Sequence, residues 1–277
     1  MANFLRRFSI AVVCGMAASC FAGIAAAQSF TASHAKISLI SETNSFQAGK
    51  SSWVGVLFDL ERGWHIYWVN PGDSGEPPKF QWQLPAGFQA KEIRWPTPVR
   101  LGTGIVIDYG YEGRVLLPVR MQAPADYRAG NAVTLSADIR YLICREVCIP
   151  AKGQASLTIP SKNGASGAAD LQLFQTTFAN SPKLLPPGWK AQAGDAGGFF
   201  LLSIDTGTSE SKATFFPLEE DQIDNAAPQI ITATARGLQL KLKKSDQLAK
   251  PISVLKGVVV FSPERAFEVS APVTAKK

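Results

Sequence analysis

Short runs in which apolar and polar residues alternate dominate the chain from about residue 35 onward. In the first half, clusters of Gly, Pro, Asn and Asp, such as NPGDSGEPPK, separate these runs. The runs are AKISLI, SSWVGVLFDLE, GWHIYWV, RVLLPVRMQA, AVTLSADIRYLI and GQASLTI. Period-two alternation is typical of strands that bury one face. The pattern predicts an all-β fold, with an antiparallel β-sandwich in the first half.

The pattern changes near residue 160. Residues 161–170 (SKNGASGAAD) are small and polar, which predicts a linker. Leu171, Phe174 and Phe178 then follow at helical spacing, which predicts one short amphipathic helix at a domain junction. The remaining runs, GGFFLLSID, KATFFPLE, QIITATARGLQLKLKK, ISVLKGVVVF and AFEVSAPV, predict a second, smaller β-rich domain over residues 171–277.

The N-terminus has the layout of an export signal. Arg6 and Arg7 precede an apolar run of small residues that ends in three alanines at positions 25–27, as in a secretory signal with an A-x-A cleavage site. We therefore expect residues 1–27 to be a signal peptide cleaved near Ala27, and residues 28–160 to form the first domain. Cys20 and the arginine pair leave lipoprotein and twin-arginine signals as alternatives.

Charge and hydropathy narrow the possible functions. The formal net charge of +6 falls to +4 once Arg6 and Arg7 are removed, and the remaining Lys and Arg residues are scattered. This distribution gives little support to nucleic-acid binding. No later segment reaches the roughly 18 consecutive apolar residues of a membrane-spanning helix, so we expect no transmembrane segment in the mature chain.

Two cysteines remain after the signal peptide, Cys144 and Cys148 in IRYLICREVCIP. On a continuous strand their sulfurs would lie about 13 Å apart. If residues 145–147 form a three-residue loop or a single helical turn, the two Cα atoms come within about 5.5 to 6.5 Å, which permits a disulfide. The residues alone leave three functions open: a structural staple, a redox couple or a metal site.

Energetics favour the redox couple over the staple. In the chain-entropy model, closing a loop of about five residues contributes on the order of 2 kcal/mol, against about 4 to 5 kcal/mol for a loop of 100 residues. A metal such as Cu(I) would need further ligands, but His34 and His65 are the only histidines and neither is near the cysteines in sequence. We expect His65 to be a half-buried strand residue and His34 an exposed one.

Aromatic residues are the other candidates for a functional site. Residues 64–95 are unusually aromatic and contain Trp64, Tyr67, Trp68, Trp82 and Trp95. Such rings most often pack in a core, but some of them could flank a thiol site. Tyr109 and Tyr111 lie in the Gly-rich stretch IDYGYEGR, which suits a turn that caps a site. Trp68, Tyr109 and Tyr111 are therefore candidate substrate-contact or cap residues. The second half contains neither Cys nor His, so we expect the chemistry to lie in the first domain.

Together these segments resemble a known family. GWHIYWVNPGDSGEPPKFQW, WPTP, DYGYEGRVLLPV and YLICREVCIP resemble, in this order, the N-terminal periplasmic domain of DsbD-type thiol:disulfide interchange proteins, especially the ScsB-like branch. FFPLEEDQIDNAAPQ and AFEVSAPV are similar to the second half of the longer ScsB-like N-terminal region. The resemblance covers nearly all of the mature chain and implies an immunoglobulin-like fold for the first domain.

The resemblance also implies a function. Cys144 and Cys148 would be the catalytic redox pair of a periplasmic protein-disulfide reductase or interchange component, with no cofactor and no metal. Its partners would be thioredoxin-like proteins or disulfide isomerases, in disulfide isomerisation, cytochrome c maturation or copper tolerance. The chain ends at Lys277 without a membrane domain, so we expect a separate membrane electron donor. The alternative is a non-enzymatic binding or copper-handling module whose cysteines bind metal or form a structural disulfide.

Overall fold

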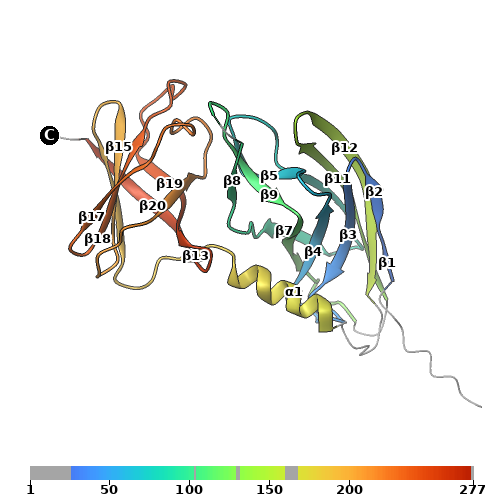
Figure 1. The fold of residues 1–277 in the computed structure, drawn as a ribbon. Helices are drawn as coiled ribbons and strands as arrows, with labels where there is room; N and C mark the ends of the chain where they lie inside the picture. The colour runs from blue at the N-terminus through green and yellow to red at the C-terminus, as the bar shows by residue number, and fades with distance from the viewer. Residues whose placement is uncertain (1–25, 103, 129–131, 160–167, 276–277) are drawn as a thin grey trace, which may run out of the picture.

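The computed structural model describes residues 26–102, 104–128, 132–159 and 168–275, which form three β-sheets and one α-helix (Figure 1). The predicted signal peptide, apart from its last two residues, and most of the predicted linker lie outside the described residues. Within them, no helix has the length and apolar character needed to cross a membrane. The all-β fold and the single short helix at the junction are confirmed.

The first sheet carries the two cysteines. Its strands run in the order β1-β12-β11-β5-β9-β8, and β6 also pairs with β11. All its pairings are antiparallel. The strands are β1 (Ala26–Gln28), β5 (His65–Gly72), β6 (Lys79–Gln83), β8 (Val99–Leu101), β9 (Asp108–Glu112), β11 (Val133–Cys144) and β12 (Cys148–Ile159).

The second sheet packs against the first to form a sandwich. It has the strand order β2-β3-β4-β10-β7 and is also antiparallel. Alternate residues of both sheets, such as Val56 and Ile139, are fully buried in one shared apolar core. This is expected when two sheets, each with one apolar face, pack face to face. The strands are β2 (Phe30–Ala32), β3 (Ala35–Ser41), β4 (Ser51–Leu60), β7 (Gln89–Ile93) and β10 (Arg114–Gln122).

The helix α1 (Ala168–Ala179) covers the outer face of the second sheet (Figure 1). Phe174 is fully buried against Ile40, Leu57 and Leu116, and Leu173 and Phe178 pack beside it. Leu171, which the spacing assigned to the buried face, is 40% exposed. The first sandwich, and not the second domain, therefore supplies the surface on which the helix packs.

The third sheet forms the second domain. Its order is β16-β19-β20-β14-β15-β18-β17, and β13 also pairs with β20. Leu202, Leu240 and Val259 belong to its own apolar core. The strands are β13 (Lys183–Leu184), β14 (Lys190–Asp195), β15 (Phe199–Asp205), β16 (Thr214–Pro217), β17 (Ile230–Thr234), β18 (Gly237–Lys243), β19 (Val254–Ser262) and β20 (Arg265–Ala275).

The two domains are joined by a buried interface. Phe216 of the second domain belongs to the core cluster of the first and meets Trp68 and Tyr109 edge-on, at centroid distances of 6.4 and 5.1 Å. Asn70, 1% exposed, donates from Nδ2 to the carbonyl oxygens of Pro217 (2.8 Å) and Glu219 (3.1 Å). These contacts fix one end of β5 against the second domain.

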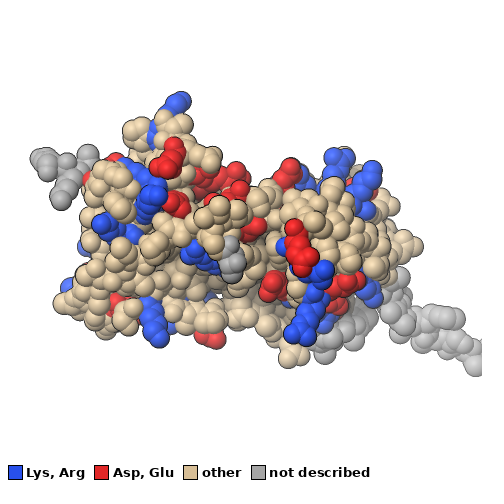
Figure 2. All heavy atoms as spheres, turned by 45° about the horizontal axis from the view of Figure 1, so that its top comes forward, with Lys and Arg blue, Asp and Glu red and all other residues tan. Residues whose placement is uncertain are grey.

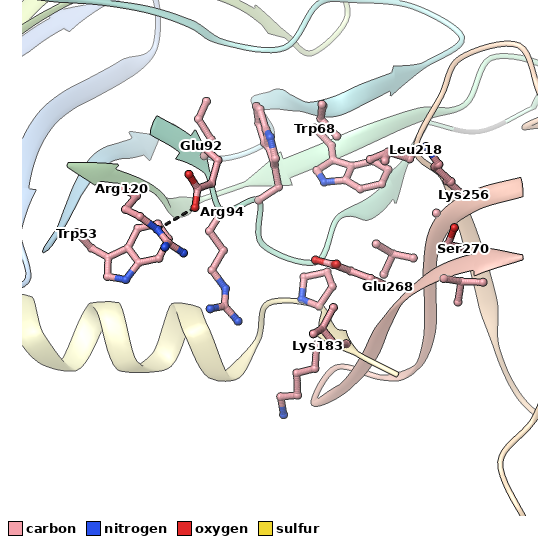
Figure 3. Close-up of a pocket in the computed structure, with 18 residues that line it drawn as sticks. Trp53, Trp68, Glu92, Arg94, Arg120, Lys183, Leu218, Lys256, Glu268 and Ser270 are labelled. Carbon is pink, nitrogen blue, oxygen red and sulfur yellow. Dashed lines mark ion pairs between the residues drawn. The ribbon is translucent and has the colours of Figure 1, made fainter. Parts of the chain in front are cut away.

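Beside this interface lies a cleft of about 860 Å³. Figure 3 shows Trp53, Arg120 and Glu92 on its first-domain side and Lys256, Glu268 and Ser270 on its second-domain side. Arg120 forms an ion pair with Glu92 (2.8 Å) and lies over the Trp53 ring. Neither cysteine lines this cleft. On the face shown in Figure 2, acidic and basic side chains are interspersed.

Candidate redox site

The two cysteines face each other at the end of the β11–β12 hairpin and form a disulfide. Residues 145–147 make the connecting loop, closed by a hydrogen bond from the Arg145 N–H to the Val147 carbonyl oxygen (3.2 Å). The Cα atoms lie 4.1 Å apart, closer than the expected 5.5 to 6.5 Å, because directly opposed residues of an antiparallel pair approach to about 4.5 Å. The chain thus adopts the three-residue loop and not the helical turn.

The two sulfur-bearing residues differ in accessibility. Cys144 is 2% exposed, whereas Cys148 is exposed. Both lie on the outer face of the first sheet, because the alternate residues Ile143, Tyr141 and Ile139 point into the sandwich core. An incoming thiol or disulfide therefore reaches the pair from the Cys148 side.

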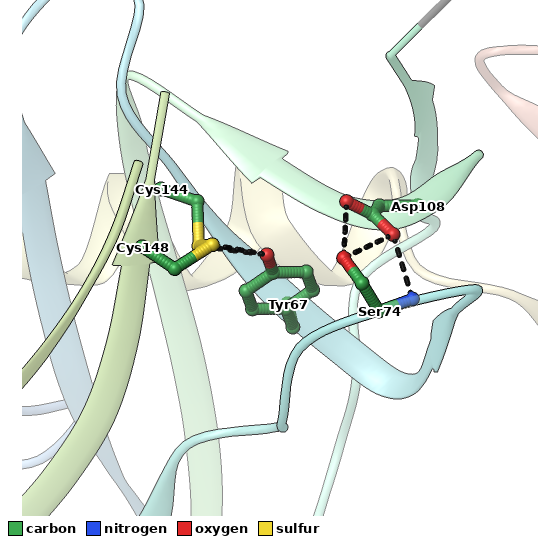
Figure 4. Close-up of a disulfide and its surroundings, with 5 residues drawn as sticks. All are labelled: Tyr67, Ser74, Asp108, Cys144 and Cys148. Carbon is green, nitrogen blue, oxygen red and sulfur yellow. Dashed lines mark hydrogen bonds between the residues drawn. A yellow bond between two sulfur atoms is a disulfide. The ribbon is translucent and has the colours of Figure 1, made fainter. Parts of the chain in front are cut away.

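Tyr67 is the side chain that contacts the sulfurs. Strand β5 lies beside the end of β11, with His65 opposite Cys144. Two residues on, the Tyr67 hydroxyl donates to Cys144 Sγ at 2.8 Å and lies 3.5 Å from Cys148 Sγ (Figure 4). Burial, with a smaller contribution from Asp108, raises the pKa of Tyr67 to about 12. The phenol therefore stays protonated at neutral pH and remains a donor.

A loop held by Asp108 covers the Tyr67 ring. Gly75 lies so close to the ring that a Cβ atom there would overlap it, and its φ of +87° is one that glycine adopts most easily. Ser74 fixes the loop, because its N–H and its hydroxyl each donate to Asp108 Oδ1 at 3.0 Å (Figure 4). Burial raises the pKa of Asp108, and the Ser74 bonds oppose that rise.

His65 adds a neutral ring to the site. Burial lowers its pKa, against the opposing effect of Asp108 and Glu112. Its ring meets the Tyr67 ring edge-on at 5.3 Å, and its buried Nε2 has no hydrogen-bond partner among the described residues. At neutral pH this imidazole is uncharged. Among the described residues, the Tyr67 hydroxyl is the group that hydrogen-bonds the sulfurs.

Comparison with known families agrees with this geometry. Residues 38–160 match the family model described as "Thiol:disulfide interchange protein DsbD, N-terminal". Residues 38–160 therefore form a DsbD N-terminal domain. A search of curated protein sequences gave no match.

Most of the chain is also similar in structure to a solved protein. That protein is the N-terminal periplasmic domain of ScsB from Proteus mirabilis, with a TM-score of 0.65 and 17% sequence identity over 88% of this chain and 96% of that chain. At this identity the likeness shows the fold. It agrees with the expected fold class, an immunoglobulin-like β-sandwich followed by a second β-rich unit.

The three candidate cap residues all belong to the core cluster that also contains Phe216. Tyr109 donates to Asn225 Oδ1 of the second domain (2.8 Å), Tyr111 donates to the Pro96 carbonyl oxygen (2.8 Å), and both are buried. Trp68 is buried against Phe216. None of the three has a hydrogen bond to the sulfurs, and DYGYE is strand β9 instead of a turn.

Gly110 explains why this glycine-rich segment is a strand. It lies opposite Tyr67, and a Cβ on it would collide with the Ile66 carbonyl oxygen. The glycine therefore permits close pairing of β9 and β5. Ser74, Gly75 and Asp108 are site residues that the sequence did not single out. Tyr67 was expected only as one of several aromatic residues that could flank a thiol site, and its hydrogen bond to Cys144 distinguishes it from the others.

Replacing Tyr67 with phenylalanine tests the contact with the sulfurs. In the reduced DsbD-type domain a thiolate would accept the Tyr67 hydrogen bond, and bonds to charged groups contribute about 1.5 to 3 kcal/mol. We expect Tyr67→Phe to lower the ratio of thiolate to thiol at neutral pH about tenfold, measured by ultraviolet absorbance. The control is Tyr141→Phe, since the Tyr141 hydroxyl bonds the Ala32 carbonyl oxygen on the opposite face. Equal thiolate fractions in both variants would contradict this role.

Proposed function

We propose that the protein is a periplasmic thiol–disulfide exchange protein that passes electrons through the Cys144/Cys148 dithiol. The observation that carries the proposal is a disulfide with one exposed and one buried cysteine, at the surface of a domain of the DsbD N-terminal family. Such an arrangement suits a disulfide that is reduced and reoxidised in turn. The Cys148 sulfur is accessible to another protein, and the Cys144 sulfur stays next to it.

The reaction would proceed in two steps. In the reduced protein, the Cys148 thiolate attacks a sulfur of the partner disulfide, so that a mixed disulfide forms and one partner thiolate leaves. The Cys144 thiolate then attacks Cys148 Sγ, which reforms the Cys144–Cys148 disulfide and releases the second partner thiolate. Two electrons pass to the partner, and its two thiolates take up the protons that the protein dithiol released.

Tyr67 has a defined place in this scheme. Its hydroxyl, 2.8 Å from Cys144 Sγ in the oxidised protein, would stabilise the Cys144 thiolate before it resolves the mixed disulfide. A hydrogen bond to a charged acceptor is about twice as strong as one to a neutral acceptor. The contact therefore favours the step in which charge develops on Cys144.

The proposal extends to location and partners. Export through the signal at residues 1–27 would place the protein in the periplasm, where thioredoxin-like proteins or disulfide isomerases would accept the electrons. A separate membrane protein would return the dithiol to its reduced state. Disulfide isomerisation, cytochrome c maturation and copper tolerance are the processes in which such an electron carrier would act.

Electron transfer between purified proteins tests the function. The reduced protein is mixed with an oxidised periplasmic disulfide isomerase or thioredoxin-like protein, quenched with acid, and both proteins are scored for free thiols by alkylation and mass. We expect two thiols to appear on the acceptor as Cys144 and Cys148 become oxidised, and no transfer from the double Cys→Ser variant. Failure to reduce any such acceptor would refute the proposal.

A further inference from the structure

A groove runs along the outer face of the hairpin that carries the disulfide. It encloses about 610 Å³. Strands β11 and β12 form its floor, and the start of β6 with the residues just before it forms one wall. We call it the hairpin groove. It is lined by Glu76, Pro77, Lys79, Arg140, Leu142, Pro150 and Lys152, and by Tyr141 and Ala151, which belong to or pack against the sandwich core.

The hairpin groove begins two residues along each strand from the disulfide, and neither cysteine is among its lining residues. In the β11–β12 register, Cys144 lies opposite Cys148, Leu142 opposite Pro150, and Arg140 opposite Lys152. Residues two apart on a strand share a face, so these three pairs lie in one line on the outer surface. At roughly 3.3 Å per residue, the apolar pair lies about 7 Å and the cationic pair about 13 Å from the cysteines.

Three cations meet at the far end of the groove. Lys79 lies opposite Arg140 in the β6–β11 register, and Arg140 lies opposite Lys152. The three adjacent strands thus place three positive side chains in a row on one face. Like charges directly opposite each other on a sheet destabilise it, so this row has a cost in the free protein.

The surrounding residues neutralise little of this charge. Lys79 pairs with Glu76 (2.7 Å), but neither Arg140 nor Lys152 has an ion-pair partner among the described residues. Asp138 lies on the same face, two residues beyond Arg140 on the side away from the cysteines, and is not among the groove-lining residues. It accepts hydrogen bonds from Gln83 and Gln154. Arg140 and Lys152 are therefore two cations beyond an apolar floor that have no ion-pair partner in the described part of the chain.

The two free cations lie too far from the sulfurs to act on the thiol chemistry. Screening by salt has a Debye length of about 8 Å at physiological ionic strength, which is shorter than the separation of about 13 Å. Their electrostatic effect falls instead on whatever occupies the groove while it reacts with the disulfide.

We infer that the hairpin groove binds an acidic, extended segment of the protein partner, next to the partner's reacting cysteine. This inference rests on the proposed exchange function and names its recognition surface. Apolar side chains of the segment would lie on Leu142 and Pro150. Its carboxylates, three to four residues from the partner cysteine, would meet Arg140 and Lys152. Complementary charge of this kind selects partners and speeds their encounter.

Matched peptides test the inference. Each peptide carries one cysteine activated as a pyridyl disulfide, with either two glutamates or two glutamines three and four residues away. The reduced protein attacks the activated disulfide, releasing thiopyridone, whose absorbance gives the rate. Exposed ion pairs contribute about 0.2 to 1 kcal/mol each, so we expect the glutamate peptide to react about fivefold faster at low salt. The difference should vanish at high salt.

Two double variants test whether the preference for the glutamate peptide comes from the hairpin groove. Arg140→Gln/Lys152→Gln should react equally with both peptides. The matched control, Lys212→Gln/Lys250→Gln, changes exposed lysines of the second domain and should keep the preference. Equal rates for the two peptides with the unaltered protein, or a preference that survives Arg140→Gln/Lys152→Gln, would overturn the inference.

A neutral probe separates this inference from the function on which it rests. Dithiodipyridine carries no charge, so all these variants should react with it at the rate of the unaltered protein. If the protein prefers the glutamate peptide but reduces no protein disulfide, the proposed exchange function is refuted, whereas the preference of the hairpin groove for acidic segments is supported. If it reduces protein disulfides without any charge preference, only the groove inference fails.

Discussion

Cys144→Ser, which keeps the exposed cysteine, is expected to capture redox partners as stable mixed disulfides, whereas Cys148→Ser is expected to capture at least about tenfold less. The difference follows from burial. Cys144 is 2% exposed, while Cys148 is exposed. A nucleophilic thiol must reach its target along the sulfur–sulfur axis, and thiol–disulfide exchange depends on such access. Non-reducing electrophoresis of mixtures with an oxidised thioredoxin-like protein measures the captured fraction.

Two controls guard this comparison. The double Cys→Ser variant should capture nothing, and circular dichroism should show the same strand content in all variants. Since serine differs from cysteine by one atom, neither single change should disturb the hairpin. Equal capture by the two single variants would contradict the assignment of Cys148 as the attacking residue.

Removing the Asn70 side chain is expected to have the largest effect on stability. Its amide spans the domain interface, donating to the carbonyl oxygens of Pro217 and Glu219 and accepting from the Gly72 N–H (3.0 Å). Leaving buried polar groups without partners costs about 1 to 3 kcal/mol each. We expect Asn70→Ala to lower the free energy of unfolding by about 2 to 3 kcal/mol, measured by urea denaturation.

The control for Asn70→Ala is Asn180→Ala. The Asn180 side chain is exposed, and among the described residues only its backbone makes hydrogen bonds. This change should leave the free energy of unfolding within about 0.5 kcal/mol of the original. Asn70→Ala should also broaden or split the transition, because the two domains would unfold less cooperatively. A single unshifted transition would show that the interface does not depend on this amide.

Local sequence patterns predicted much of the fold. Alternation of apolar residues identified the strands, because one face of each sheet is buried in a sandwich core. The spacing of Phe174 and Phe178 identified the helix. For a disulfide, the spacing of the cysteines required either a loop or a helical turn at residues 145–147, since a continuous strand would have kept the sulfurs apart. The strands, the helix and the connection between the cysteines could be predicted because each depends on residues that are close together in the sequence.

The surroundings of the disulfide depend on contacts between distant segments. Tyr67 and Cys144 are 77 positions apart, and nothing in the alternation of GWHIYWV says which strand lies beside β11. The position of Tyr109 also depends on pairing between distant segments. Its glycine-rich surroundings indicated a turn, but Gly110 allows β9 to pair closely with β5. Asp108 and Ser74 meet across 34 positions, so their role could not be recognised locally.

The reduction potential of the Cys144–Cys148 disulfide tests the central claim most directly. It can be measured by equilibrating the protein with dithiol and disulfide buffers and counting free thiols by mass. Inert structural disulfides in secreted proteins have potentials below about −300 mV, whereas labile or catalytic ones lie higher. An electron-passing dithiol predicts a value above about −300 mV. A value below that limit would identify the pair as a structural staple and contradict the proposed function.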